Sequence, residues 1–351
     1  MKNHPHSILP AAFALVCAVL MVSHALGADK SDRKSEGGRR VYHEVPDTVE
    51  CVKDVSFGTG GTPPLRLDIY RPKKRGDAPL PVVIYIHGGG WMEGDKAEKH
   101  SSDAALQLAE AGFFVASINY RLSGEAAFPA AIEDCKCAVR FLRAHGGQYG
   151  IRTERIGAWG MSAGGHLSLL LGTSGGMTPL EGLGGWAEQS SRVQAVVSFY
   201  GPTDLALRAG KHQRGKAEPK PRPDKRSGKR DPEGQFLGGT FAEKPKAYRL
   251  ASPITHVTPD DPPTFLVHGA EDRGVPPEQS RRMADALKSA GVPAELVIVP
   301  GAGHGFYSLG ADKVRELGQR AVEFFRRELS ANPATSTVPV KTQIQTPRAV
   351  P

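Results

Sequence analysis

Short apolar segments alternate with segments of helical periodicity along most of this chain, and this alternation constrains the fold more than any other feature. Eight segments rich in β-branched and aromatic residues are predicted to be strands: Val49–Phe57, Leu65–Tyr70, Val82–His87, Phe113–Tyr120, Arg155–Trp159, Val193–Tyr200, Thr264–His268 and Glu295–Val299. Five segments are predicted to be helices: Ala97–Ala111, Ala130–His145, Ser162–Leu171, Pro277–Ala290 and Ala311–Leu329. Strands that alternate with helices predict an α/β fold with an eight-stranded, mostly parallel sheet and helices on both faces. The first two strands are expected to form an antiparallel edge hairpin.

The alternating region is predicted to be one domain, residues 41–329, because neither an internal repeat nor a shift in composition divides it. Apolar residues make up 39% of the chain and charged residues 23%, which excludes wholesale disorder and collagen-like or coiled-coil architecture. Residues 28–40 are predicted to be a flexible linker. Residues 330–351, rich in Thr, Val, Pro and Gln, are predicted to be a disordered tail.

The first 27 residues have the pattern of a secretory signal peptide. Lys2 precedes an uncharged apolar run, Ile8 to Val22, and small residues follow at Gly27 and Ala28. The run is shorter than the roughly 20 residues that a membrane-spanning helix needs. Cleavage after Gly27 or Ala28 and export to the periplasm or the extracellular space are therefore expected, with an uncleaved anchor as the alternative. No other segment is apolar enough to span a bilayer.

Cleavage would leave three cysteines, Cys51, Cys135 and Cys137, so at least one thiol stays unpaired. Cys135 and Cys137 lie two residues apart on diverging faces of a predicted helix, which favours two buried thiols rather than a mutual disulfide. The sequence contains neither a C-x-x-C pair nor H-E-x-x-H. No metal and no cofactor are predicted.

The net charge of +8 comes from one segment, residues 208–230. This segment contains ten Lys or Arg and two acidic residues, a balance of 10 − 2 = +8, so the rest of the chain is neutral. Its Lys, Arg, Pro and Gly content without apolar periodicity predicts an exposed basic insertion after the sixth strand. A solvated loop is the favoured interpretation, contact with an anionic polymer is the alternative, and no nucleic-acid partner is expected.

A G-x-S-x-G motif, Gly160 to Gly164, joins the fifth predicted strand to a predicted helix. A serine on such a tight strand-to-helix turn stands clear of the sheet, and the flanking glycines remove Cβ clashes. Ser162 is therefore the candidate nucleophile.

The third predicted strand ends in Gly88-Gly89-Gly90-Trp91, where missing side chains let backbone amides approach a ligand oxygen. Gly89 and Gly90, with Ala163, are predicted to form an oxyanion hole. Which of the glycines donate is left open. A phosphate-binding loop is disfavoured because G-x-x-x-x-G-K-[ST] is missing.

A serine nucleophile needs a base and a carboxylate that orients it. Asp272 follows the seventh predicted strand and His304 follows the eighth, so both lie where sites in parallel sheets collect. The order Ser162, Asp272, His304 is that of a nucleophile-elbow hydrolase. Glu271 is the alternative orienting carboxylate.

Two aromatic residues beside these motifs, Trp91 and Phe306, are candidates for the wall of a substrate pocket, although Trp91 could equally cap the core. Arg121 and Asp134 are expected to form an internal ion pair with a structural role.

Four motifs together resemble the α/β-hydrolase superfamily, near its esterase/lipase branch: His87–Trp91, Gly160–His166, Tyr200-Gly-Pro-Thr-Asp204 and Gly303–Phe306. The chain is most similar to the feruloyl- and acetyl-esterase-like group, which is related to hormone-sensitive-lipase-type carboxylesterases. The resemblance covers about residues 50–328. The chain departs from that pattern by its basic insertion, which falls where the superfamily often builds a lid, and by lacking long amino-terminal cap helices.

The resemblance implies an exported serine hydrolase that cleaves carboxylic esters, either short acyl esters or acetyl and feruloyl esters of plant polysaccharides. The expected partner is a small-molecule or polysaccharide-linked ester. The alternatives are a prolyl-peptidase-like serine hydrolase and a non-catalytic glycan-binding module on the same fold. The oligomeric state is left open.

Overall fold

The computed structural model describes residues 44–58, 64–214 and 231–330, with the side chains of 210–214 and of 330 left out. The predicted signal peptide, the linker, the tail from residue 331 and residues 215–230 of the basic insertion lie outside the described residues and stay predictions. Among the described helices, none combines the length and the apolar character that crossing a bilayer requires.

One sheet of eight strands runs in the order β1-β2-β4-β3-β5-β6-β7-β8. The strands are β1 (Val49–Gly58), β2 (Leu65–Pro72), β3 (Leu80–Ile86), β4 (Phe114–Ile118), β5 (Ile151–Met161), β6 (Ala195–Phe199), β7 (Thr264–Gly269) and β8 (Ala294–Val299). β1 pairs with β2 and β2 with β4 in antiparallel fashion, and all other neighbours are parallel. The predicted eight-stranded α/β fold with an antiparallel edge hairpin is confirmed.

The inner strands are apolar on both faces, as expected of a parallel sheet covered on two sides. In β3, Val82, Ile84 and Ile86 belong to one buried cluster, whereas Val83 and Tyr85 belong to the other. β5 begins four residues earlier than predicted (155 − 151), because Ile151 already pairs with Leu80 of β3.

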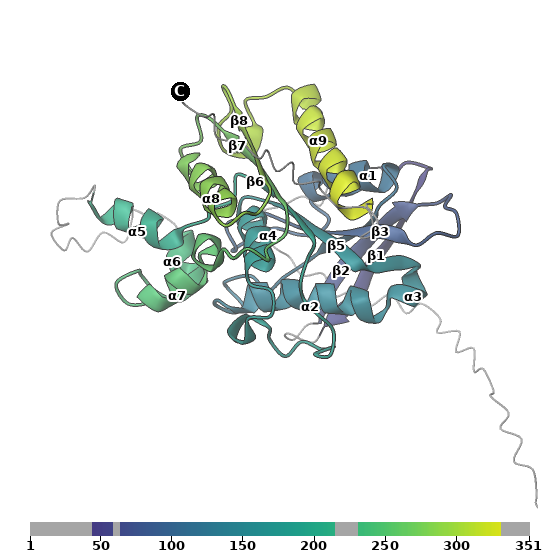
Figure 1. The fold of residues 1–351 in the computed structure, drawn as a ribbon, viewed down its shortest axis with the longest axis horizontal. Coiled ribbons are helices and arrows are strands. Elements are labelled where there is room, and N and C mark those ends of the chain that lie inside the picture. Colours follow the sequence, from purple (N-terminus) through teal and green to yellow (C-terminus); the bar gives the residue numbers. More distant parts are fainter. Residues whose placement is uncertain (1–43, 59–63, 215–230, 331–351) are drawn as a thin grey trace, which may run out of the picture. The chain divides into compact units, whose positions relative to one another are not determined.

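Helices α1 (Lys99–Glu110) and α9 (Ala311–Ser330) pack on one face of the sheet. Helices α2 (Ala130–Ala144), α4 (Ala163–Thr173) and α8 (Glu278–Ser289) pack on the other (Figure 1). These five are the predicted helices, displaced by no more than two residues at either end. In α9 the buried Leu317, Ala321, Phe324 and Phe325 recur at helical spacing and so form one apolar stripe.

Three helices after β6 have no counterpart in the predicted elements: α5 (Leu205–Arg214), α6 (Pro232–Leu237) and α7 (Pro245–Leu250). They gather at the left of Figure 1. α6 and α7 are only six residues long, too short to show a helical period, and α5 runs into the basic segment 208–230. The remaining short elements are α3 (Gly146–Tyr149) and three 3₁₀ turns, η1 (Thr178–Leu180), η2 (Pro253–His256) and η3 (His304–Phe306).

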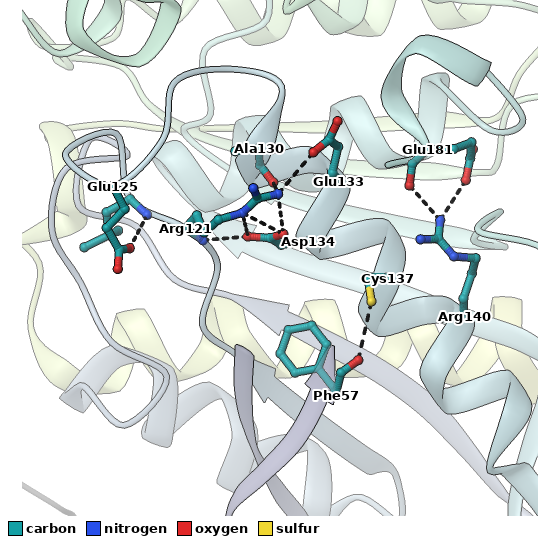
Figure 2. Close-up of polar contacts among 10 residues, drawn as sticks. Phe57, Arg121, Glu125, Ala130, Glu133, Asp134, Cys137, Arg140 and Glu181 are labelled. Carbon is teal, nitrogen blue, oxygen red and sulfur yellow. Dashed lines mark hydrogen bonds and ion pairs between the residues drawn. The ribbon is translucent and has the colours of Figure 1, made fainter. Parts of the chain in front are cut away.

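The predicted ion pair after β4 is confirmed (Figure 2). Arg121 Nε donates to both carboxylate oxygens of Asp134, at 3.1 and 2.9 Å, and Arg121 Nη2 donates to Glu133 at 3.1 Å. These bonds tie the loop to α2. On the same helix the buried Cys137 thiol donates to the Phe57 carbonyl at 3.4 Å. Cys135 is also buried and free, so the prediction of two unpaired thiols is confirmed.

Candidate active site

Ser162 stands on the turn between β5 and α4 in a backbone conformation that few side chains adopt, with φ 53° and ψ −119°. Such strain persists only where the surroundings hold it in place. The Ser162 amide donates to the Phe199 carbonyl of β6 at 2.9 Å, and its carbonyl accepts the His166 amide at 2.9 Å. The sheet and the first turn of α4 therefore fix the serine from both sides.

Two glycines of the motif are required by close backbone approach. A Cβ on Gly164 would lie 2.0 Å from the carbonyl oxygen of Ile86 at the end of β3, and one on Gly160 would lie 2.3 Å from the carbonyl of Gly164. A residue larger than glycine at either position would push α4 away from the sheet. The tight packing sets the height of Ser162 above the strand ends.

The three residues predicted to form a triad are joined by hydrogen bonds. Ser162 Oγ lies 2.9 Å from His304 Nε2, and His304 Nδ1 lies 2.7 Å from Asp272 Oδ2. Because a carboxylate only accepts, Nδ1 carries the proton and Nε2 presents its lone pair to the serine hydroxyl. Glu271, the alternative carboxylate, is exposed, and its amide bonds the Ala302 carbonyl.

Asp272 is held as an anion by a ring of donors. Burial by itself would raise the pKa of this carboxyl group, but hydrogen bonds from His268, His304 and the Val275 amide outweigh burial and lower the pKa. The amides of Gly274 and Val275 donate to Oδ1 at 2.9 and 2.8 Å. Asp272 therefore stays ionised through the neutral and mildly acidic range.

The glycine loop after β3 lies directly against the serine. A Cβ on Gly88 would be 3.6 Å from Ser162 Cβ. Gly89 and Gly90 both have positive φ, 99° and 61°, and the Gly89 carbonyl closes a turn with the amides of Met92 and Glu93. Ala163 is the first residue of α4, so its amide has no partner inside the helix. The amides predicted to form an oxyanion hole thus come from two segments that meet beside Ser162.

The two aromatic side chains predicted to line a substrate pocket are instead packed inside the protein. Trp91 is 3% exposed, stacks on Phe236 at 4.6 Å and donates from Nε1 to His166 Nδ1 at 3.1 Å. His166 Nε2 in turn donates to the Ala251 carbonyl at 2.6 Å. Of the two roles considered for Trp91, capping the core is the one that its burial supports.

Phe306 is 2% exposed and meets Tyr200 edge to face at 4.7 Å. The Tyr200 ring meets the His304 imidazole at 5.0 Å, so Phe306 reaches the triad only through Tyr200. Tyr200 was not among the predicted site residues. Its position at the start of the Tyr200–Asp204 motif was the available signal.

The predicted solvated insertion is wrong at its amino-terminal end, because Arg208 is a half-buried residue of α5. Its guanidinium forms an ion pair with Glu233 of α6 at 2.6 Å and donates to the Gly274 carbonyl at 3.1 Å. A Cβ on Gly274 would lie 3.5 Å from the His304 ring. Arg208 therefore links α5 and α6 to the loop that carries Asp272.

Within residues 44–58, 64–214 and 231–330, no group of three or more His, Cys, Asp or Glu side chains is arranged to hold a metal ion.

Acidification from pH 7 to pH 4 is expected to destabilise the folded protein through two buried histidines, His87 and His166. Burial lowers the pKa of both from 6.5 to about 4. The unfolded state therefore binds protons more readily than the folded state does. The contribution of each neutral, buried histidine to the free energy of unfolding is fully present above pH 6.5 and is lost as the pH falls towards 4. The loss approaches roughly 3 kcal/mol for each histidine, measurable by urea unfolding at several pH values.

The matched variants are His87→Gln and His166→Gln. Each removes one group that takes up a proton on unfolding, so each curve of unfolding free energy against pH should be flatter than that of the wild type. Curves of equal slope between pH 6.5 and 4 would contradict the assignment.

Comparisons with known proteins identify the family and the fold. The family described as BD-FAE matches residues 67–287. Esterase LipC of Mycobacterium tuberculosis is 32% identical over 248 residues, which cover 70% of this chain and 58% of LipC. The chain thus spans somewhat more than half the length of that curated relative.

Two solved structures have similar folds. A truncated carbohydrate esterase from gut microbiota is 32% identical with a TM-score of 0.70, over 81% of this chain and 98% of that chain. A thermophilic esterase from Thermogutta terrifontis, Est2, solved with butyrate bound, is 26% identical with a TM-score of 0.63, over 80% and 94%. The match over most of the folded region, joined to the eight-stranded sheet and the serine on its strand-to-helix turn, shows that this chain belongs to the BD-FAE family, in the esterase branch of the α/β-hydrolase fold.

Proposed function

We propose that this protein hydrolyses carboxylic esters, with Ser162 as nucleophile, His304 as general base and acid, and Asp272 as the carboxylate that orients His304. The observation that carries the proposal is the hydrogen-bonded chain from Ser162 Oγ through His304 to Asp272, at 2.9 and 2.7 Å. A serine on a strained turn, a base within hydrogen-bond reach and a buried anion behind that base are the parts that acyl transfer requires.

In the first half-reaction, His304 Nε2 accepts the Ser162 hydroxyl proton while Oγ attacks the ester carbonyl carbon. The carbonyl oxygen becomes an anion and is bound by amides among Gly89, Gly90 and Ala163. Asp272 stabilises the imidazolium that forms. His304 then returns the proton to the leaving alcohol as the carbon–oxygen bond breaks, which leaves Ser162 acylated.

Water completes the reaction by the same steps. His304 removes a proton from the water molecule, the hydroxide attacks the acyl carbon, and the amides again bind the oxyanion. Collapse of the intermediate returns the proton to Ser162 and releases the carboxylic acid. No cofactor takes part in any step.

The proposed substrates are esters of short acyl groups, including acetyl or feruloyl groups carried by polysaccharides. Support comes from the motif resemblance and from two similar structures: one is named a carbohydrate esterase, and the other was solved with butyrate bound. Since the chain covers little more than half of LipC, its activity and substrates are proposed rather than transferred.

A panel of p-nitrophenyl esters from acetate to palmitate, with methyl ferulate and acetylated xylan, tests the proposal. We expect turnover to be highest on short acyl esters and kcat/KM to fall by about tenfold or more from butyrate to palmitate, because one of the similar esterase structures was solved with butyrate bound. A prolyl p-nitroanilide serves as the probe for the peptidase alternative. Faster cleavage of that amide than of every ester would reassign the enzyme, and lack of turnover on all substrates would favour a binding module.

A further inference from the structure

Asp272 contacts a second histidine, His268, in addition to His304. His268 is the penultimate residue of β7 and is completely buried. Its Nε2 lies 2.8 Å from the Val275 carbonyl and 3.3 Å from Asp272 Oδ2, and its Nδ1 lies 2.7 Å from Ser280 Oγ on α8. The side chain therefore joins β7, the loop of Asp272 and α8.

The partners of His268 determine its tautomer. A carbonyl and a carboxylate both accept hydrogen bonds, so the Nε2 atom between them must carry a proton. Nδ1 is hydrogen-bonded to the Ser280 hydroxyl, a group that can either donate or accept.

Two histidines therefore meet at one carboxylate oxygen of Asp272, at different distances. Asp272 Oδ2 receives His304 Nδ1–H at 2.7 Å on one side and faces His268 Nε2–H at 3.3 Å on the other. Each histidine is hydrogen-bonded in turn to a serine, Ser162 or Ser280. Only the Ser162 end lies at the predicted oxyanion hole, which leaves the Ser280 end without a reaction to perform.

We propose that His268 is a positioning residue that orients the Asp272 carboxylate and shares its charge, an inference that rests on the proposed function. Because His268 Nε2 also bonds Val275, it holds both ends of the turn whose amides bind Oδ1. A donor shared on Oδ2 weakens the pull of Asp272 on the His304 proton. His268 thereby sets both the orientation of the Asp272 carboxylate and its strength as a hydrogen-bond acceptor for His304.

Other groups face the same carboxylate and imidazole. Tyr200 of the β6 loop lies edge-on to His304, and burial raises its pKa, so it stays neutral. The Arg208 guanidinium reaches the Gly274 carbonyl from α5 but is paired with Glu233. None of the variants below changes these groups, so their influence on the pH profile is constant.

The test compares His268→Phe, which removes both ring nitrogens, with His268→Gln, whose side-chain amide keeps a donor near the place of Nε2. For His268→Phe we expect kcat on p-nitrophenyl acetate to fall about tenfold with KM unchanged, and the acid limb of the kcat/KM profile to shift upward by about half a pH unit. His268→Gln should have a kcat and an acid limb close to those of the wild type. Ser280→Ala, which removes only the hydroxyl bonded to His268 Nδ1, should give an intermediate effect.

A spectroscopic readout does not depend on turnover. The proton on His304 Nδ1, identified in ¹H spectra by its loss from His304→Ala, should move downfield in His268→Phe because Asp272 becomes a stronger acceptor. His145→Phe is the control, since it removes a histidine bonded to the Phe141 carbonyl on α2 and should leave the acid limb in place.

An unshifted acid limb and an unmoved Nδ1–H resonance in His268→Phe would overturn the proposal, as would equal kinetic losses in His268→Phe and His268→Gln. If His268→Phe does not fold, the same two measurements are made on Ser280→Ala, and an unshifted acid limb with an unmoved Nδ1–H resonance in that variant would overturn the proposal. Equal ester turnover by the wild type and Ser162→Ala would instead reject the proposed function, and the resonance measurement would still report on His268.

Discussion

Ser162→Ala is expected to lower kcat on short-chain esters by roughly 10⁴- to 10⁶-fold, because triad members act as a unit and the remaining amides alone cannot supply a nucleophile. The fold should be unaffected. Alanine fits where serine stands, and the backbone bonds of Ser162 to Phe199 and His166 do not involve its hydroxyl. Initial rates under enzyme excess and a thermal melt measure the two effects separately.

Ser168→Ala is the matched control for this variant. Ser168 lies on the same helix, is buried, and donates its hydroxyl to the Gly164 carbonyl, as serines inside helices often do. It should retain most of the wild-type activity. Retention of even a tenth of the activity in Ser162→Ala would remove Ser162 from the role of nucleophile.

Asp272→Asn is expected to lower kcat by about 10⁴-fold, the size of the effect in another Ser-His-Asp enzyme. An asparagine amide can turn its NH₂ towards His304 Nδ1, and the imidazole then takes the tautomer that cannot accept the Ser162 proton. KM for p-nitrophenyl acetate should change little, since the carboxylate does not contact the substrate. Steady-state kinetics at pH 7 to 9 measure the effect.

Glu271→Gln is the control, because it makes the same chemical change one residue away. Glu271 is exposed, whereas Asp272 is buried against His304. The variant should keep wild-type kcat within about twofold, as expected for a surface substitution. A severe defect in Glu271→Gln with a mild one in Asp272→Asn would exchange the two roles.

Much of the architecture could be predicted because it depends on local pattern. Segments such as β3 and β4 are short and apolar on both faces, and α9 carries an apolar stripe, so their periodicity alone identifies them. The helices between β6 and β7 were missed because α6 and α7 are only six residues long and α5 lies partly within the basic segment 208–230. What stabilises these helices is contact with distant segments, such as Phe236 on Trp91 and Arg208 on Glu233 and Gly274.

The sequence predicted Ser162, Asp272 and His304 as candidate site residues, but it did not predict the residues that contact and orient them. Ser162, Asp272 and His304 follow strand ends, and the carboxyl ends of parallel strands meet at one edge, so their proximity follows from topology. Tyr200 and Arg208 reach the site through contacts between segments that are far apart in sequence, whereas His268 lies only four residues before Asp272. No spacing predicts which oxygen of Asp272 a second histidine will face.

The sequence by itself determined the order of the strands and of the five helices that cover the sheet, the position of Ser162 on a glycine-flanked turn and the order of Ser162, Asp272 and His304. Each of these depends on neighbouring residues and on chain direction. Only the tertiary structure decided which carboxylate meets His304, that Trp91 and Phe306 are buried, and that Arg208 is a half-buried ion-pair residue rather than part of a solvated loop. The physical reason is that burial and hydrogen-bond partners depend on atoms that the fold brings together. The pKa of Asp272, for example, is lowered by His268 of β7, by the Val275 amide and by His304, which follows β8.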